Sequence, residues 1–332
     1  MKAKYREPSA HLKDGSVAVI KQQNLISKRR FRLSMDSEEF KVAPGKKISL
    51  KDYNPCRVPK WAKKQEDKEG KKAVKEQALT VLEANRQKLI EMQELLWASD
   101  TYSMLIILQG MDGAGKDSTI SHVMSGVNPQ GCQVTSFKTP SEEEQNHDFL
   151  WRHTKALPER GRIGIFNRSY YEDVLIVKVR PEVFQKQKLP PEEQGKQFWN
   201  HRYEDINMFE RHLVRNGTVV LKFFLNVSKE EQKQRLLKRL ENHDKNWKFS
   251  LTDLSERSKW KDYMEAYEDM LNETSTDWAP WYVIPADKKW VTHASVSEII
   301  VSQIKKLDLK YPVLTEEQCE SLEKAKVELE KE

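Results

Sequence analysis

Apolar residues in this chain gather in short runs, and the longer stretches between them have the residue spacing of helices. The runs lie at residues 104–108, 132–137, 163–166, 219–227 and 281–284. Such runs are typical of strands that are buried on both faces of a parallel sheet. Strands that alternate with helices predict right-handed βαβ crossovers. We therefore expect an α/β fold with three layers, in which helices cover a central parallel sheet.

The segments that flank this region differ from it in composition. Residues 1–70 are rich in Lys and Arg, most densely at 28–32, and are interpreted as a basic N-terminal arm. The pattern leaves its role open, because the arm could stay solvated, dock on the domain or contact a neighbouring subunit. Residues 71–312 would form the main domain, beginning with a helix over 71–98. The charged residues 313–332 predict a C-terminal surface helix.

A glycine-rich segment follows the first predicted strand and precedes a helical stretch. It reads GMDGAGKDST over residues 110–119. Glycines allow the backbone to curl so that several N–H groups point at one anion, and the helix adds the positive end of its dipole. Lys116 adds a full charge that can follow a phosphoryl group through transfer. The segment therefore predicts a phosphate-binding P-loop, whose contacts would come from Gly110, Gly113, Ala114, Gly115, Lys116, Asp117 and Ser118.

Two acidic residues distinguish this loop from an ordinary P-loop. Asp117 stands where the GxxxxGK[ST] pattern has Ser or Thr, and Asp112 lies inside the loop. Two carboxylates beside a phosphate would repel it unless a cation lay between them. Asp112 and Asp117 are therefore predicted to form a Mg²⁺ site. The alternative is a glycine-rich turn with an exposed lysine.

A second motif follows the strand at 163–166 and begins with Asn167 and Arg168. Because parallel strands place their carboxyl ends at one edge of the sheet, we expect both residues to lie near Gly110. Asn167 occupies the position where a P-loop enzyme usually carries a metal-binding Asp, so it would supply a neutral oxygen. Arg168 is predicted to neutralise phosphate charge, with a surface ion pair as its alternative role.

A helical lid is expected over residues 229–275. A capping box at Ser228 opens a helix that carries Arg235, Lys238 and Arg239 on one face. Lid closure would exclude water and bring these cations to the transferring phosphoryl group. A solvated basic helix is the alternative. Lys138, which follows a strand end, is predicted to bind phosphate as well.

Several long segments of the chain carry a family resemblance. Residues 70–310 resemble the polyphosphate kinase 2 family, which is itself related to thymidylate kinases within the P-loop kinase fold. The matching segments are Gly110 to Thr119, Ser125 to Gly131, Ser136 to Lys138, His147 to Arg152, Asn167 to Asp173, Trp247 to Ser250 and Pro285 to Trp290.

The resemblance implies roles for individual residues. The acidic residue of the family's first motif corresponds to Asp112, its lysine to Lys116, and the arginine of its second motif to Arg168. Asn167 and the stretch at 44–53 resemble the subgroup called class III, whose members act on nucleoside mono- and diphosphates. Relatives form dimers or tetramers, so a homo-oligomer is expected.

The bulk composition changes this picture little. A net charge of +6 suits an anionic substrate but does not distinguish polyphosphate, nucleotides and nucleic acid. The three cysteines, Cys56, Cys132 and Cys319, lie too far apart to indicate a disulfide framework or a zinc site. The polar N-terminus and the lack of a long apolar run predict a cytoplasmic protein without a membrane span.

Together these features predict a polyphosphate-dependent nucleotide kinase. It would use Mg²⁺ for reversible in-line phosphoryl transfer between inorganic polyphosphate and AMP or ADP. One alternative is an ATP-dependent nucleoside monophosphate kinase, which shares the loop but normally needs Ser or Thr in place of Asp117. An alternative of another class is a non-catalytic protein that binds polyphosphate or nucleic acid. That alternative does not explain the acids inside the loop.

Overall fold

Five parallel strands form the central sheet of the protein. The computed structural model describes residues 37–332, together with their side chains except those of residues 37, 61–69 and 71. The strand order in this range is β2-β3-β1-β4-β5. The expected α/β fold with a parallel sheet is confirmed, because every strand coincides with a predicted apolar run. The strands are β1 (Ser103–Gln109), β2 (Cys132–Ser136), β3 (Ile163–Asn167), β4 (Thr218–Asn226) and β5 (Trp281–Pro285).

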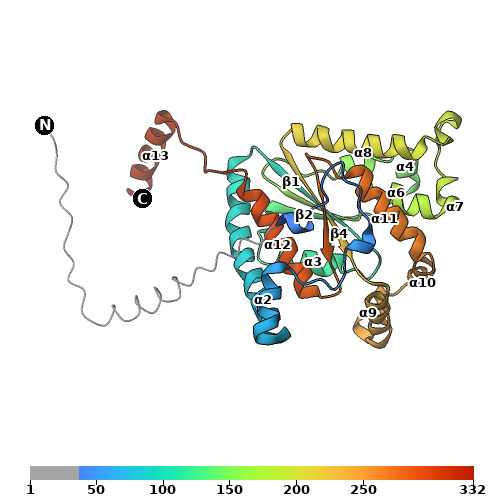
Figure 1. Cartoon of the computed structure of the whole chain (residues 1–332). Coiled ribbons are helices and arrows are strands. Elements are labelled where there is room, and N and C mark those ends of the chain that lie inside the picture. Colours follow the sequence, from blue (N-terminus) through green and yellow to red (C-terminus); the bar gives the residue numbers. More distant parts are fainter. Residues whose placement is uncertain (1–36) are drawn as a thin grey trace. The chain divides into compact units, whose positions relative to one another are not determined.

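Helices cover both faces of this sheet (Figure 1). One face carries α2 (Lys60–Ser99), α3 (Lys116–Val123) and α12 (Lys289–Lys305), and the other carries α6 (Glu172–Val179), α8 (Phe198–Arg215) and α11 (Trp260–Thr274). The remaining helices are α4 (Glu142–Gln145), α5 (Trp151–Thr154), α7 (Pro181–Phe184), α9 (Lys229–Glu241), α10 (Leu251–Ser258) and α13 (Glu316–Leu329). Short 3-10 turns lie at η1 (Ser37–Phe40), η2 (Leu50–Asp52), η3 (Pro129–Gly131), η4 (Pro191–Gln194) and η5 (His243–Lys248).

The long helix α2 shows how the sequence pattern determines packing. Leu82, Leu89 and Leu96 are buried at intervals of seven residues and form its core-facing side. Gly70 has φ of 79° and interrupts the helical geometry, so the uninterrupted part begins at residue 71. This start agrees with the helix that the sequence predicts over 71–98.

The segment of residues 38–57 lies along the β5 edge of the sheet and against α11. The backbone N–H of Val42 donates to the Trp281 carbonyl at 2.8 Å, and the N–H of Leu50 donates to Glu268 Oε2 at 2.6 Å. This covering protects the edge strand, and β5 is buried along its whole length. Docking on the domain is therefore the arrangement of this part of the arm, whereas the basic cluster at 28–32 lies outside the described residues.

Among residues 37–332, no helix is both long enough and apolar enough to span a bilayer. In the described part of the chain, no three His, Cys, Asp or Glu side chains come together as a metal-binding group. Cys56, Cys132 and Cys319 are free thiols.

Two buried histidines make the folded state sensitive to acid. Burial and the nearby charge of Arg152 lower the pKa of His153 to about 3, and burial followed by the charge of His122 lowers the pKa of His293 to about 3. In the unfolded chain both histidines become protonated near pH 6.5, whereas in the folded protein they stay neutral until the pH approaches 3. Stability is therefore fully present above about pH 6.5 and is lost as the pH falls toward 3.

We predict that the free energy of unfolding falls by up to about 1.4 kcal/mol per pH unit for each of these histidines below pH 6.5. His153→Phe keeps a ring in the core but removes the titrating group, so its pH profile should be shallower than that of the wild type. Urea unfolding at several pH values measures this slope. Exposed His212→Gln is the control and should keep the wild-type slope, and a His153→Phe profile as steep as the wild type would contradict the account.

Candidate active site

A large cavity lies where the loops that follow β1, β2 and β3 meet α9 and α10. Its volume is about 2520 Å³. The structure brings together nearly all of the side chains and loop residues that the sequence predicts for the site. Those that line the cavity are Gly110, Asp112, Gly113, Gly115, Lys116, Asp117, Ser118, Lys138, Asn167, Arg168, Arg235, Lys238 and Arg239, whereas Ala114 lies beneath its surface at 2% exposure.

The loop between β1 and α3 has the curled backbone of an anion cradle. Gly110 adopts φ of 150°, and a Cβ there would lie only 2.9 Å from the carbonyl oxygen of Leu225. Gly115 adopts φ of 108° at the N-terminal cap of α3. Only glycine tolerates these two positions without strain or a clash. The loop therefore ends directly at the positive pole of a helix.

Two side chains of α9 hold the outer side of this loop. Gln232 donates to the Asp112 carbonyl at 2.8 Å, and Arg235 donates to the carbonyls of Gly113 and Ala114 at 2.9 and 2.8 Å. Because a trans peptide points its N–H opposite to its carbonyl, these bonds turn the N–H groups of Gly113 and Gly115 away from α9. Both residues line the cavity.

Arg235 thus differs from the free lid cation that the sequence suggests. It is 9% exposed, and its remaining donors bind Glu231 Oε1 at 2.8 Å and the carbonyls of Ala286 and Asp287 at 2.6 and 3.1 Å. All five guanidinium N–H donors are therefore occupied. The contacts favour a supporting role in the loop, because a guanidinium so engaged has no donor left for a substrate.

The side chain of Lys116 folds back toward the start of the loop. Its Nζ donates to the Gly110 carbonyl at 2.6 Å and to the Met111 carbonyl at 3.4 Å, and the residue is 8% exposed. Burial lowers the pKa of Lys116, and the charge of Arg168 lowers it further against the opposing effect of Asp112. Neutral carbonyls stabilise a buried ammonium group less than an anion does. An anion bound in the cradle would therefore stabilise the charge of Lys116.

An ion pair joins the loop to the second motif. Arg168 Nη2 lies 2.5 Å from Asp112 Oδ1. Burial alone would raise the pKa of Asp112, but the charges of Lys116 and Arg168 outweigh it and hold that pKa below its usual value. The backbone of Arg168 has φ of 65°, a left-handed conformation that costs about 1 kcal/mol or more for a residue with a Cβ. The turn after β3 is therefore strained at the residue that faces Asp112.

Asn167 and Asp117 form a second link between the two motifs. Asn167 Nδ2 donates to Asp117 Oδ1 at 2.7 Å. An aspartate at position 167 would place two carboxylates in contact, whereas the neutral amide avoids that repulsion and donates a hydrogen bond to Asp117. Asp112 and Asp117 each keep a second carboxylate oxygen that could bind a cation. Because Mg²⁺ usually takes one or two protein carboxylates and completes its shell with water and phosphate oxygens, this donor set fits the ion.

Sequence reasoning missed two acids at the start of α6. Burial raises the pKa of Glu172, with Arg168 and Lys116 opposing it, and burial raises the pKa of Asp173 to about 6. Both residues line the cavity. The signal that could have revealed them is their position, since they directly follow the second motif and begin a helix.

A side region of the cavity is lined by Phe149, Arg152, Asp173 and Arg202. The Arg202 guanidinium lies 3.9 Å from the centre of the Phe149 ring, and its Nε has no hydrogen-bond partner among the described residues. Arg152 donates to the Lys138 carbonyl at 2.8 Å. This region therefore places an aromatic ring beside guanidinium groups, a combination that can receive a planar polar group.

Cations outnumber acids around the whole cavity. Among the described residues, fourteen Lys and Arg side chains line it against ten Asp and Glu. Lys138 and Lys238 are exposed, and Arg239 is paired with Asp253 at 3.4 Å. Arg180 instead forms an ion pair with Glu256, which ties the end of α6 to α10. The cavity therefore has the positive balance that a polyanion requires.

The match to known proteins agrees with this geometry. The family model described as polyphosphate kinase 2 (PPK2) matches residues 70–312. The chain belongs to the polyphosphate kinase 2 family. A family member from Rhodopseudomonas palustris, named ADP-polyphosphate phosphotransferase, is 47% identical over 284 residues, which cover 85% of this chain and 94% of that protein.

Two further family members are similar over most of their length. An AMP/ADP-polyphosphate phosphotransferase from Meiothermus ruber is 44% identical, with 83% of this chain and 95% of that protein covered. The crystal structure of polyphosphate kinase 2 from Arthrobacter aurescens is similar with a TM-score of 0.73 and 40% identity, covering 84% of this chain and 92% of that one. The resemblance to this family and its P-loop kinase fold is thus confirmed.

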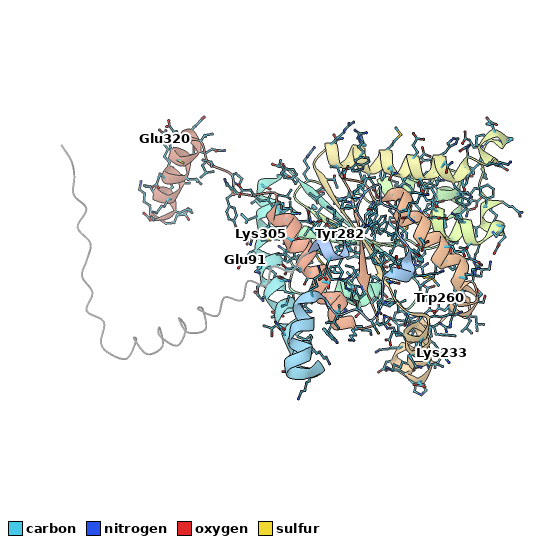
Figure 2. All side chains as sticks on the ribbon, viewed as in Figure 1. Glu91, Lys233, Trp260, Tyr282, Lys305 and Glu320 are labelled. Atoms are coloured by element: carbon cyan, nitrogen blue, oxygen red, sulfur yellow. The ribbon has the colours of Figure 1, made fainter. Side chains whose placement is uncertain are left out.

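We predict that Arg235→Met lowers the free energy of unfolding by about 3 kcal/mol, because five polar contacts of a buried cation are lost. Hydrogen exchange in residues 110–116 should also become faster. Lys233→Met is the matched control, since Lys233 is exposed on the same helix (Figure 2). Equal stability and equal exchange in the two variants would show that Arg235 does not support the loop.

Proposed function

We propose that the chain is a polyphosphate-dependent nucleotide kinase. The observation that carries the proposal is the pairing of an anion cradle with carboxylates, in which Asp112 and Asp117 flank Lys116 and each is bound by a residue of the second motif. A protein that only bound polyanions would gain nothing from acids at that place. The names of the relatives from Rhodopseudomonas palustris and Meiothermus ruber support the same substrates.

Mg²⁺ is the proposed cofactor, and Asp112 and Asp117 would hold it. When bound, it would shield the negative charge of the phosphates and let them approach the carboxylates. The protein contributes the remaining charge compensation. Lys116 and the N–H groups of Gly113 and Gly115 would bind the transferred phosphoryl group, and Arg168 would move from Asp112 to a phosphate oxygen as charge accumulates there.

The proposed reaction is a direct in-line transfer without a phosphoenzyme. A terminal phosphate oxygen of AMP or ADP attacks the terminal phosphorus of polyphosphate. The bond from that phosphorus to the bridging oxygen breaks, and the shortened chain leaves as an anion. The attacking oxygen is already anionic near neutral pH, so catalysis depends on positioning and charge compensation more than on a general base. The reverse reaction uses the same groups.

The remaining site residues would guide the two long substrates. Lys138, Lys238 and Arg239 would contact successive phosphates of polyphosphate, because a flexible polyanion needs a line of cations. Ser118 would bind phosphate at the start of α3. The surface of Phe149 and Arg202 would receive the nucleotide base, and Asn167 fits an enzyme that accepts both mono- and diphosphates.

The proposed domain boundaries are those that the sequence analysis predicts. Residues 71–312 would form the phosphotransferase domain, with a lid over 229–275 that closes on the cavity. A homo-oligomer, either a dimer or a tetramer, is proposed because Leu322 and Leu329 of the terminal helix are exposed at 57% and 69%. The proposed location is the cytoplasm. Light scattering coupled to gel filtration measures the oligomeric state.

We predict that Lys116→Ala lowers the rate of ADP phosphorylation by polyphosphate by about a thousandfold or more, because charge compensation in the cradle is lost. Its thermal midpoint should stay close to that of the wild type. Chromatography of AMP, ADP and ATP after incubation with polyphosphate and Mg²⁺ measures the rate. Lys88→Ala, an exposed substitution on α2, is the control and should keep full activity. Wild-type turnover by Lys116→Ala would refute the assignment of this loop.

The same assay separates the proposal from an ATP-dependent nucleoside monophosphate kinase. With ADP and polyphosphate present and no second nucleotide, the proposed enzyme produces ATP in proportion to the polyphosphate consumed. A monophosphate kinase would form no ATP at the expense of polyphosphate. It would instead phosphorylate AMP only when ATP is supplied.

A further inference from the structure

A fully buried polar cluster lies behind the second motif and takes no part in the chemistry proposed above. It consists of Lys222 on β4, Glu210 on α8, and Tyr170 and Tyr171 in the turn between β3 and α6. Lys222 and Glu210 are both 0% exposed, and Lys222 Nζ lies 2.6 Å from Glu210 Oε2. Sequence patterns do not reveal this pair, because Lys222 lies within an apolar run and Glu210 within a charged helix.

The hydrogen bonds of the cluster are complete. Lys222 Nζ donates to Glu210, to the Tyr171 hydroxyl at 2.9 Å and to the Thr274 carbonyl at 2.7 Å, which uses its three hydrogens. Glu210 Oε1 accepts from the Tyr170 hydroxyl at 2.8 Å and from the Tyr171 hydroxyl at 2.7 Å. Oε1 of Glu210 therefore accepts hydrogen bonds from both tyrosines, and Oε2 accepts one from Lys222.

These two tyrosines directly follow the strained residue of the active site. Arg168 has the left-handed φ of 65°, and its side chain is directed to Asp112 in the cavity. Tyr170 and Tyr171 lie on the inner side of the same turn at 0% exposure. A strained conformation persists only where the surrounding structure over-determines it. The two hydroxyl bonds supply such a constraint within three residues of Arg168.

We propose that Glu210 and Lys222 are positioning residues for Arg168, acting through the hydroxyls of Tyr170 and Tyr171. With the hydroxyl bonds in place, the turn holds Arg168 at the conformation that aims its guanidinium at the cradle. Without them, the backbone of Arg168 relaxes toward negative φ values, and the guanidinium moves away from Asp112 and the cradle. Packing alone does not explain two buried charges, because apolar side chains of similar volume fill a core equally well.

The test is a double-mutant cycle that compares the loss of both hydroxyls in the presence and absence of Arg168. Tyr170→Phe/Tyr171→Phe removes the two hydrogen-bonding groups and keeps both rings. We expect this change to lower kcat by about tenfold in the Arg168 protein, with a much smaller effect on KM. In an Arg168→Ala background, the same change should lower kcat by less than about twofold, because the group that it positions is already absent.

The outcomes of the cycle separate positioning from a general loss of structure. A merely structural role would lower kcat by the same factor in both backgrounds, and that result would overturn the proposal, as would an unchanged kcat in the Arg168 protein. Tyr203→Phe is the control, since Tyr203 lies on α8, the helix of Glu210, and its buried hydroxyl has no hydrogen-bond partner among the described residues. If the double variant does not fold, Tyr170→Phe alone carries the same comparison.

The inference rests on the proposed phosphoryl transfer, and the two can fail separately. An inactive wild-type protein with polyphosphate and ADP would refute the proposed function. An active wild type with additive effects in the cycle would leave that function intact and refute only the positioning role.

Discussion

One ion pair joins the two loops of the candidate active site, between Asp112 in the loop after β1 and Arg168 in the turn after β3. These strands are neighbours in the sheet, and the pairing of Leu108 with Asn167 brings the two loops to the same edge. Arg168 contacts Asp112 from a left-handed backbone conformation, and we propose that the surrounding contacts maintain it. A buried cluster holds the turn from the inside, while α9 holds the opposite loop through Gln232 and Arg235.

Each of the two acids in the loop has a partner in the turn after β3, although only one of the two contacts is an ion pair. Asp112 neutralises Arg168, and Asn167 satisfies Asp117. A phosphate chain would add negative charge to a cavity that already holds carboxylates, and the proposed Mg²⁺ together with the cations of the lining would compensate that charge. This arrangement explains why a P-loop with acids inside it suits an enzyme that handles polyphosphate, and why the same acids would only hinder a passive polyanion-binding surface.

The sequence predicted the parts of the protein that depend on local pattern, and it missed the parts that depend on long-range contacts. All five strands, the P-loop and the second motif could be predicted, because apolar runs and glycine spacing are local signals. The contacts of Arg235 were not predictable, since its partners lie about 50 and 120 residues away in the chain. The Glu210–Lys222 pair was not predictable for the same reason, because the two residues lie on different elements and only the tertiary fold brings them together.

We propose that Asp112 binds a divalent cation during transfer and pairs with Arg168 only when that cation is absent. The most direct measurement is the Mg²⁺ dependence of ADP phosphorylation by polyphosphate in the wild type and in Asp112→Asn. The substitution keeps the shape of the side chain and one oxygen but removes its charge. We expect the half-saturating Mg²⁺ concentration to rise by about tenfold or more in the variant. An unchanged Mg²⁺ dependence, with activity close to that of the wild type, would contradict it.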